Sequence, residues 1–273
     1  MQRLVITGGA GRLATALRAR LSRKDRFLTF LDIKPPQPPA RPSARESSAI
    51  VDIADLEALT DAFRGAAAVL HLGGFASERS WAEILTTNID GTRNVLEAAH
   101  RAGVSRVLLA SSIHAVGYHR SDDAAGECVL APRPDSFYGV GKVALEALGS
   151  LYADRMGLKV LSLRIAAFEE RPSSNRSLSL WFSPGDAARA VEAFLVDAAP
   201  GHRIAWGVSR NTRSLLDLSA GTAFGYSPQD DAEDYASLVP SHPEPWDDLL
   251  AGGFLAPERE LGMVFDKAVP QDT

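Results

Sequence analysis

Short runs of apolar, often β-branched residues alternate with longer amphipathic stretches along the first 165 residues. Runs of this length are typical of buried parallel strands, and the amphipathic stretches are typical of helices that cover a sheet. The pattern therefore predicts an α/β fold with a doubly wound parallel sheet. We expect six strands, at residues 3–7, 27–32, 49–51, 67–71, 104–110 and 159–164, and helices at residues 11–22, 55–63, 81–102 and 137–156.

The pattern changes after residue 165. Residues 168–180 are polar and rich in turn formers, and Ser183-Pro184 then predicts a helix start, with serine as the N-cap and proline at the first helical position. That helix should run to about Asp197, followed by a strand at 203–207 and short helices. We therefore expect a main domain at residues 1–165 and a small substrate-binding cap at residues 166–273, interleaved with the same body. The proline-rich stretch 34–42 should be a surface loop.

The composition argues against several classes of protein. The chain has 29 Lys and Arg against 34 Asp and Glu, a net charge of -5, and no basic stripe, so a nucleic-acid partner is not expected. The single Cys128 cannot form an internal disulfide, and no Cys and His group has the spacing of metal ligands. No apolar stretch approaches the roughly 20 residues that span a bilayer. We expect a cytoplasmic protein without a metal or a membrane partner.

A glycine-rich turn, Gly8-Gly-Ala-Gly11-Arg-Leu-Ala14, joins the first predicted strand to the first helix. Glycine lets the backbone approach a pyrophosphate, and a helix N-terminus supplies free amides and a partial positive charge. A tight structural turn would also explain the glycines, but their place between strand and helix favours binding. Asp32 ends the second strand, where a carboxylate accepts both ribose hydroxyls and repels a 2′-phosphate. This predicts a Rossmann-type domain that binds NAD, although the nearby Lys34 leaves dual use of NADP open.

Two further loops follow predicted strands on the cofactor side. Open α/β sheets bind ligands at the carboxyl ends of their strands. Asp52 and Ile53 follow the third strand and are placed to meet the adenine. Leu72, Gly73 and Gly74 follow the fourth strand and leave room for the pyrophosphate and ribose.

A Tyr and a Lys four residues apart, Tyr138 and Lys142, share one face of a predicted helix. Oxidation of an alcohol needs a base for the hydroxyl proton, and a free tyrosine with a pKa of about 10 is a poor base near neutrality. We expect the Lys142 ammonium and a positive nicotinamide to lower the pKa of Tyr138. Such a pair also arises by chance, but Ser112, at the end of the fifth strand, can hydrogen-bond the same substrate oxygen. The combination predicts a dehydrogenase.

These motifs together resemble those of the extended short-chain dehydrogenase/reductases. The resemblance rests on 7–11, Asp32, 88–92, Ser111-Ser112 and 138–142, and it covers residues 1–165. Within that superfamily the chain is similar to the NAD-dependent uronate dehydrogenases, through residues 71–74, 110–118, 164–165 and 176–183. The Trp206-Gly207 segment also fits that group.

The resemblance implies a role for each matching residue. Tyr138 would be the base, Lys142 its activator and a ribose ligand, and Ser112 the polarising hydroxyl. Arg176 would bind a sugar carboxylate and His114 would line the sugar pocket, although a solvated arginine and a structural histidine are the alternatives. Asn88 would support the active-site backbone or a water relay. Arg12, Leu13, Ile33, Asn88, Ser111, Ile165, Tyr138 and Lys142 would contact the cofactor, and Ser77, Ser112, Ile113, His114, Tyr138 and Arg176 the substrate.

The reaction so implied is the NAD-dependent oxidation of the C1 hydroxyl of a cyclic sugar acid, such as galacturonate or glucuronate, to an aldarolactone. A homodimer or higher homo-oligomer built on the two long helices is also implied. Ile113, Ala167 and Ala76 depart from the pattern, because each stands where a uronate dehydrogenase would present a hydrogen-bonding side chain. Lost contacts of this kind change discrimination strongly. The substrate is therefore expected to be less hydroxylated, differently oriented or larger than a free uronate.

Three other functions remain open from the sequence. One is a dehydrogenase of another sugar, or of a sugar phosphate held by Arg171 and Arg176. Another is a nucleotide-sugar epimerase or dehydratase, although the part of the chain after Arg164 is short for a nucleotide-binding region. The last is a regulator that senses the dinucleotide without turnover, which the presence of both Tyr138 and Lys142 disfavours.

Overall fold

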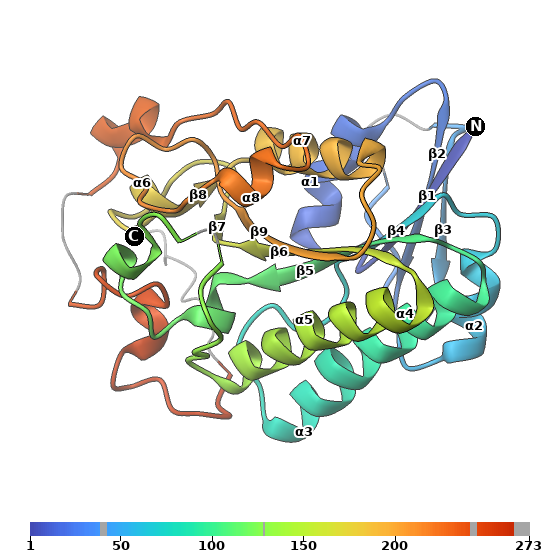
Figure 1. The fold of residues 1–273 in the computed structure, drawn as a ribbon, viewed down its shortest axis with the longest axis horizontal. Helices are drawn as coiled ribbons and strands as arrows, with labels where there is room; N and C mark the ends of the chain where they lie inside the picture. Colours follow the sequence, from blue (N-terminus) through green and yellow to red (C-terminus); the bar gives the residue numbers. More distant parts are fainter. Residues whose placement is uncertain (39–42, 128, 241–244, 265–273) are drawn as a thin grey trace.

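The computed structural model describes residues 1–38, 43–127, 129–240 and 245–264. Within them, seven parallel strands form one sheet in the order β3-β2-β1-β4-β5-β6-β9 (Figure 1). The strands are β1 (Gln2–Thr7), β2 (Arg26–Asp32), β3 (Glu46–Ile50), β4 (Ala68–His71), β5 (Arg106–Ser112), β6 (Lys159–Ile165) and β9 (His202–Gly207). The doubly wound parallel sheet is confirmed, and the strand expected at residues 203–207 joins the six expected in the first 165 residues as its seventh strand, β9.

Helices cover both faces of this sheet, as Figure 1 shows. Leu4 and Ile6 of β1 belong to the apolar cluster that packs under α1 and α7, whereas Val5 belongs to the cluster under α2, α4 and α5. Successive side chains of a strand point to opposite faces, so a strand buried on both sides is apolar throughout. The covering helices are α1 (Arg12–Leu21), α2 (Leu56–Phe63), α4 (Gly91–Arg101), α5 (Phe137–Met156) and α7 (Pro184–Val196).

The third strand lies earlier in the chain than expected. β3 begins at Glu46 rather than at residue 49, and its side chains are mostly exposed because it is the edge strand of the sheet. An edge strand covered on neither side needs no apolar pattern, so its polar first half carries no signal. Residues 35–38 of the proline-rich stretch are irregular, as expected, while residues 39–42 and Cys128 lie outside the described residues.

The helix expected at residues 81–102 contains a π-helical segment. It consists of α3 (Trp81–Glu83), the π-helix η1 (Ile84–Asp90) and then α4. The π-helix packs tightly on α5, because a Cβ at Gly141 would lie 2.9 Å from Cγ2 of Ile84. Segments of this kind are frequent at functional sites. The expected helix is confirmed in its span, and its π-helical segment is a local feature that the sequence pattern did not indicate.

The region after residue 165 contributes to the main sheet and also builds a separate layer at one end. The strand expected at 203–207 is β9, which pairs with β6, and α7 packs against α1. The predicted N-cap of α7 is confirmed, since the hydroxyl of Ser183 accepts the N–H of Asp186 at 2.8 Å, with Pro184 in the first turn. The sheet therefore depends on chain segments from both halves of the sequence.

The remaining short elements gather at the carboxyl ends of β5 and β6, at the left of Figure 1. β7 and β8 form a small parallel pair there. The short elements are η2 (Ile113–Val116), η3 (Ser121–Ala124), β7 (Ala167–Phe168), α6 (Ser177–Leu180), β8 (Trp181–Phe182), α8 (Ser219–Thr222), η4 (Ala232–Leu238) and η5 (Gly252–Leu255).

Two features are absent from the residues that the structure describes. None of their helices combines the length and the apolar character that a bilayer-crossing helix requires. They also contain no group of three or more His, Cys, Asp or Glu side chains placed to hold a metal ion.

Candidate active site

The turn between β1 and α1 has the geometry of an anion-binding site. Gly8 has a φ of +69°, and a Cβ at this position would lie 2.6 Å from the backbone nitrogen of Gly73, so only glycine fits. Gly11 is the N-cap of α1 and makes no side-chain capping bond. A phosphate group can therefore bind at the first amides of α1.

Asp32 lies beside this turn, at the end of β2. Its carboxylate accepts the backbone N–H of Ala10 at 2.9 Å and that of Lys34 at 3.1 Å. Arg12 donates to the carbonyl of Phe168 at 2.7 Å and so connects the turn to β7. A carboxylate next to a glycine turn and an open helix N-terminus fits the ribose and pyrophosphate of a dinucleotide.

The loops that follow β3 and β4 carry the other residues expected at the cofactor. Asp52 is exposed and accepts the N–H of Ala54, while Ile53 packs on Gly91. Asn88 holds the loop after β4, since its side chain accepts the N–H of Phe75 at 2.9 Å and donates to the Phe75 carbonyl at 3.0 Å. The structure thus places Asn88 as a support of the active-site backbone, one of the two roles implied for it.

The structure brings Tyr138, Lys142 and Ser112 together. Tyr138 lies in the first turn of α5, and its phenol hydrogen-bonds with the hydroxyl of Ser112 at the end of β5. The ammonium of Lys142 lies 5.3 Å from the centre of the Tyr138 ring and donates to the Ala110 carbonyl at 2.6 Å. α5 reaches this position because Gly139 lacks a Cβ, which would lie only 2.4 Å from the His114 carbonyl oxygen.

Burial sets the proton affinities of these groups in the cofactor-free protein. Burial raises the pKa of Tyr138 to about 12, although the hydrogen bond with Ser112 opposes the rise. Burial lowers the pKa of Lys142 to about 8, against the negative charge of Glu146. Loss of solvation thus has the larger effect on both groups, and the lowering of the Tyr138 pKa expected from Lys142 together with a positive nicotinamide stays a prediction.

An aromatic and acidic cluster lies next to the phenol. The Nδ1 of His114 lies 2.6 Å from a carboxylate oxygen of Asp135, and the other oxygen of Asp135 accepts the Ser136 hydroxyl at 2.6 Å. The His114 ring stacks on Phe254 with 3.8 Å between ring centres, and its edge meets Tyr138 at 5.7 Å. The side chain of His114 is therefore fixed beside the proposed base.

Arg176 is half-buried, with its Nε atom buried beside Gly252. Its guanidinium donates to the Leu250 carbonyl, but its Nε has no hydrogen-bond partner among the described residues. Burial lowers the pKa of Arg176, whereas the charges of Asp247, Asp135 and Glu169 act in the opposite direction. A guanidinium with a buried, unused N–H is suited to an anionic ligand.

The other predicted site residues lie at or after strand ends, apart from Leu13 in α1. The Ser111 hydroxyl donates to Glu146 at 2.6 Å, on the face of β5 opposite Ser112. Ile113 is buried in an apolar cluster with Leu250, against which Ala167 packs. Ser77 is part-buried in the loop after β4, Ile33 is 62% exposed beside Asp32, and Leu13, Leu72 and Ile165 pack at the margin of the core beneath α1 and α7.

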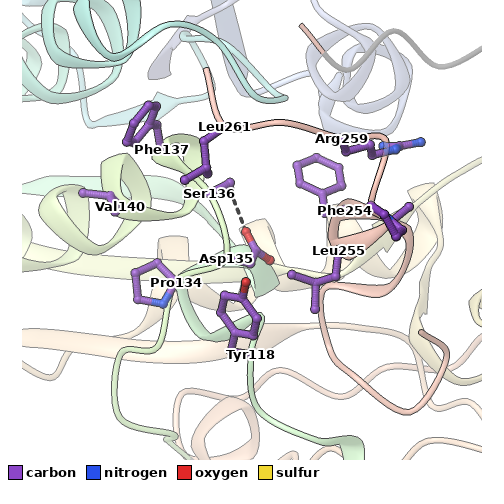
Figure 2. A pocket seen from close by; sticks show the side chains of 12 residues that line it. Tyr118, Pro134, Asp135, Ser136, Phe137, Val140, Phe254, Leu255, Arg259 and Leu261 are labelled. Carbon is purple, nitrogen blue, oxygen red and sulfur yellow. Dashed lines mark hydrogen bonds between the residues drawn. The ribbon is translucent and has the colours of Figure 1, made fainter. Parts of the chain in front are cut away.

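A cavity of about 350 Å³ opens between the start of α5 and residues 254–261. Figure 2 shows the Asp135 carboxylate among its lining side chains, bonded to Ser136, with the Tyr118 ring below it. Phe254 lines this cavity and also stacks on His114. One aromatic ring therefore contacts both the cavity and the His114 side chain next to Tyr138.

Four residues of the site were missed by the sequence analysis. Asp135 and Glu78 are buried carboxylates that accept hydrogen bonds from groups around Tyr138. The negative charge of Glu146 acts on Lys142. Glu146 stands four residues after Lys142, a helical spacing that would have suggested contact. Asp135 and Glu78 precede α5 and α3 without any distinctive motif, and Phe254 comes from a region without periodicity. Only the fold brings these three together.

Comparison with known proteins agrees with this geometry. Residues 4–176 match the model of the NAD dependent epimerase/dehydratase family. The chain is 36% identical to uronate dehydrogenase of Pseudomonas putida over 243 residues, which are 89% of this chain and 90% of that protein. It is 35% identical to L-arabinose 1-dehydrogenase (NAD(P)(+)) of Haloferax volcanii, over 85% of this chain and 98% of that protein.

A solved structure gives the same result for the fold. Uronate dehydrogenase from Agrobacterium tumefaciens superposes with a TM-score of 0.86 at 32% identity, covering 96% of this chain and 99% of that one. The match extends well beyond the glycine turn and the catalytic helix into the region after residue 165. The chain therefore belongs to the NAD dependent epimerase/dehydratase family of extended short-chain dehydrogenase/reductases.

Proposed function

We propose that this chain is an NAD-dependent dehydrogenase that oxidises the C1 hydroxyl of a cyclic uronate, such as galacturonate or glucuronate, to an aldarolactone. The observation that carries the proposal is the buried Nε of Arg176, unpaired among the described residues, near the Tyr138 cluster. The similarity to uronate dehydrogenases over most of the chain supports it. A carboxylate on the substrate would supply the anion that the guanidinium lacks.

The predicted cofactor agrees with membership of an NAD dependent family. When NAD is bound, it accepts the hydride that leaves C1. We propose that the glycine turn at 8–11 holds its pyrophosphate, that Asp32 accepts its ribose hydroxyls, and that the loops at 52–53 and 72–74 complete its site. The same turn leaves no room for side chains, as the position of Gly8 against Gly73 requires.

The remaining chemistry belongs to the residues of the chain itself. Tyr138 accepts the proton of the C1 hydroxyl, Ser112 hydrogen-bonds the same oxygen, and Lys142 stabilises the phenolate by its charge. C1 thus loses a hydride to the cofactor and its hydroxyl loses a proton to Tyr138, and a C=O bond forms next to the ring oxygen. The product is a lactone, and atoms and electrons balance without a further reactant.

A substrate panel tests this function. Purified protein with NAD and galacturonate or glucuronate should produce NADH, seen as growing absorbance near 340 nm. Aldoses, sugar phosphates and nucleotide sugars at equal concentration complete the panel. If none of these compounds yields NADH while the protein still binds the dinucleotide, the dehydrogenase function is rejected in favour of a dinucleotide-sensing role.

Replacing Arg176 with Ala should raise the KM for a uronate roughly 10- to 100-fold, because a charge-assisted hydrogen bond contributes about 1.5–3 kcal/mol. The KM for a neutral aldose should stay unchanged, and Arg176→Lys should recover part of the loss. Initial rates at varied sugar concentration measure both constants.

Arg171→Ala is the matched control, since Arg171 is exposed in the same loop. A sugar phosphate held by both arginines would instead make the two variants equally defective. If Arg176→Ala leaves the KM for uronates as it was, this guanidinium does not bind the carboxylate.

A neutral aldose is the second candidate substrate. Ile113 and Ala167 share an apolar cluster beside the site, so they offer a sugar ring no hydrogen bonds. The arabinose dehydrogenase relative also supports this candidate. A ratio of kcat/KM that favours arabinose over both uronates would select it.

We also propose that the chain forms a homo-oligomer in the cytoplasm and that residues 166–273 provide the substrate-binding cap. Leu151 on α5 is 53% exposed and Leu85 at the start of η1 is 38% exposed, which supports association through these helices. Light scattering during gel filtration should give a mass of at least two chains, and Leu151→Glu should reduce it. A monomeric mass for the unaltered protein contradicts the assembly.

A further inference from the structure

Glu78 is a completely buried carboxylate next to the catalytic helix, with 0% of its surface exposed. Its two oxygens accept three backbone N–H groups: Tyr138 at 2.7 Å, Phe137 at 3.1 Å and Gly262 at 2.9 Å. Among the described residues it takes part in no ion pair. Burial of a carboxylate is costly without such compensation, so the three N–H groups and the helix N-terminus must stabilise it.

Two of these bonds fix the backbone of the proposed base. The first amides of a helix have no partner within the helix. In α5, Glu78 binds the amides of Phe137 and Tyr138, while the hydroxyl of Ser136 binds that of Gly139 at 3.0 Å. The first turn of α5 is therefore held by Glu78 at the residue whose side chain takes the proton.

The third bond joins the same carboxylate to the C-terminal segment, which we define as residues 250–262. This segment crosses the substrate side: Leu250 binds Arg176, Phe254 stacks on His114, and Gly262 ends it at Glu78. Its first part is anchored separately, because the N–H of Ala251 donates to the Gly117 carbonyl. Glu78 thus holds the far end of the segment.

We propose that Glu78 is a positioning residue: one carboxylate holds Tyr138 through the first turn of α5 and fastens the C-terminal segment over the substrate site. The inference rests on the proposed function for its catalytic half. The loop that carries Glu78 also follows Gly73 and Gly74, so the same loop connects the cofactor side, the base and the covering segment. Glu78 touches no reacting atom and acts only through these backbone groups.

Two variants separate the two contacts. Glu78→Gln keeps the shape but turns one oxygen into a donor that faces N–H groups, and it should lower kcat at least tenfold with the Kd for NADH within twofold. Gly262→Pro removes the third N–H donor, and it also releases the backbone there because Gly262 has a φ of +81°, which proline cannot adopt. It should raise the sugar KM at least fivefold, keep kcat within threefold, and speed trypsin cleavage after Arg259 at least fivefold.

Glu57→Gln is the matched control, because it makes the same substitution at a carboxylate that is 79% exposed. It should behave as the unaltered protein in every assay. If the kcat of Glu78→Gln equals that of the control, the positioning of Tyr138 is overturned. If trypsin cuts Gly262→Pro after Arg259 no faster than the control, the fastening of the segment is overturned.

The readouts also separate this inference from the proposed function. Cleavage after Arg259 is measured without sugar, so it tests the fastening of the C-terminal segment even if no sugar is oxidised. NADH binding is likewise measured without sugar. Absence of turnover with every sugar rejects the proposed function, and the positioning of the base with it. Should Glu78→Gln not fold, Glu78→Asp retains the charge at a shorter reach, and a kcat like that of the control would then overturn the positioning role.

Discussion

Replacing Tyr138 with Phe should lower kcat for uronate oxidation roughly 10²- to 10⁴-fold, the range that a positioned general base contributes. In the proposed mechanism the phenol takes the proton from the C1 hydroxyl, while Ser112 and Lys142 only assist it through their contacts. The ring itself would remain in place beside His114. NADH should therefore still bind, with a Kd close to that of the unaltered protein.

The pH profile gives the same prediction a second measurement. Burial raises the pKa of Tyr138 to about 12 without the cofactor, so the base is mostly protonated near neutrality. The positive charge of an oxidised nicotinamide would lower this pKa, and kcat/KM should therefore rise with pH as the phenol ionises. Tyr138→Phe should retain no such rise.

Tyr152→Phe serves as the control for this variant. Tyr152 lies on the same helix, and its hydroxyl bonds Glu97 away from the site, at 3.0 Å. Its loss should leave kcat unchanged. Turnover by Tyr138→Phe at a rate near that of Tyr152→Phe would remove Tyr138 from the role of base.

Replacing Glu146 with Ala should lower the free energy of unfolding by about 3–5 kcal/mol, because it leaves a buried guanidinium unpaired. Arg164 is 1% exposed and donates two hydrogen bonds to the Glu146 carboxylate, both of 2.8 Å. The same carboxylate accepts the Ser111 hydroxyl. For a chain of this size the melting temperature should fall by roughly 10 °C.

The same variant should alter the pH dependence of turnover. The charge of Glu146 raises the pKa of Lys142 against the larger effect of burial, which lowers it to about 8. Without Glu146 the pKa of Lys142 falls further, so the ammonium loses its proton at lower pH. Any decline in kcat on the alkaline side should therefore begin at lower pH than in the unaltered protein.

Thermal unfolding of two further variants completes this prediction. Asp154→Ala removes an exposed carboxylate from the same helix and should have little effect. The double variant Glu146→Leu with Arg164→Met removes both charges and should recover much of the lost stability. If Glu146→Ala melts within a degree or two of Asp154→Ala, the buried pair does not stabilise the fold as described.

The sequence indicated the main body well because burial on both faces leaves a strong pattern. The apolar runs around Val5 and Val69 gave the central strands, and the N-cap of α7 was visible as Ser183-Pro184. The pattern missed the start of β3, where Glu46 begins an exposed edge strand, and it gave no sign of the π-helical segment η1 within the helix that it predicted. Local sequence carries no signal of either effect.

The residues of the candidate site fall into the same two groups, those with a local sequence signal and those without one. The sequence by itself determined the chemistry and the family, because the glycine turn, Asp32 and the pair of Tyr138 and Lys142 are local motifs tied to strand ends and helical spacing. Only the tertiary structure decided what surrounds them. Glu78 and Asp135 come from separate loops and Phe254 from the short helix η5, and no periodicity links positions so far apart in the chain. Burial, which raises the pKa of Tyr138 and lowers that of Lys142, is likewise a property of the packed fold and not of either side chain.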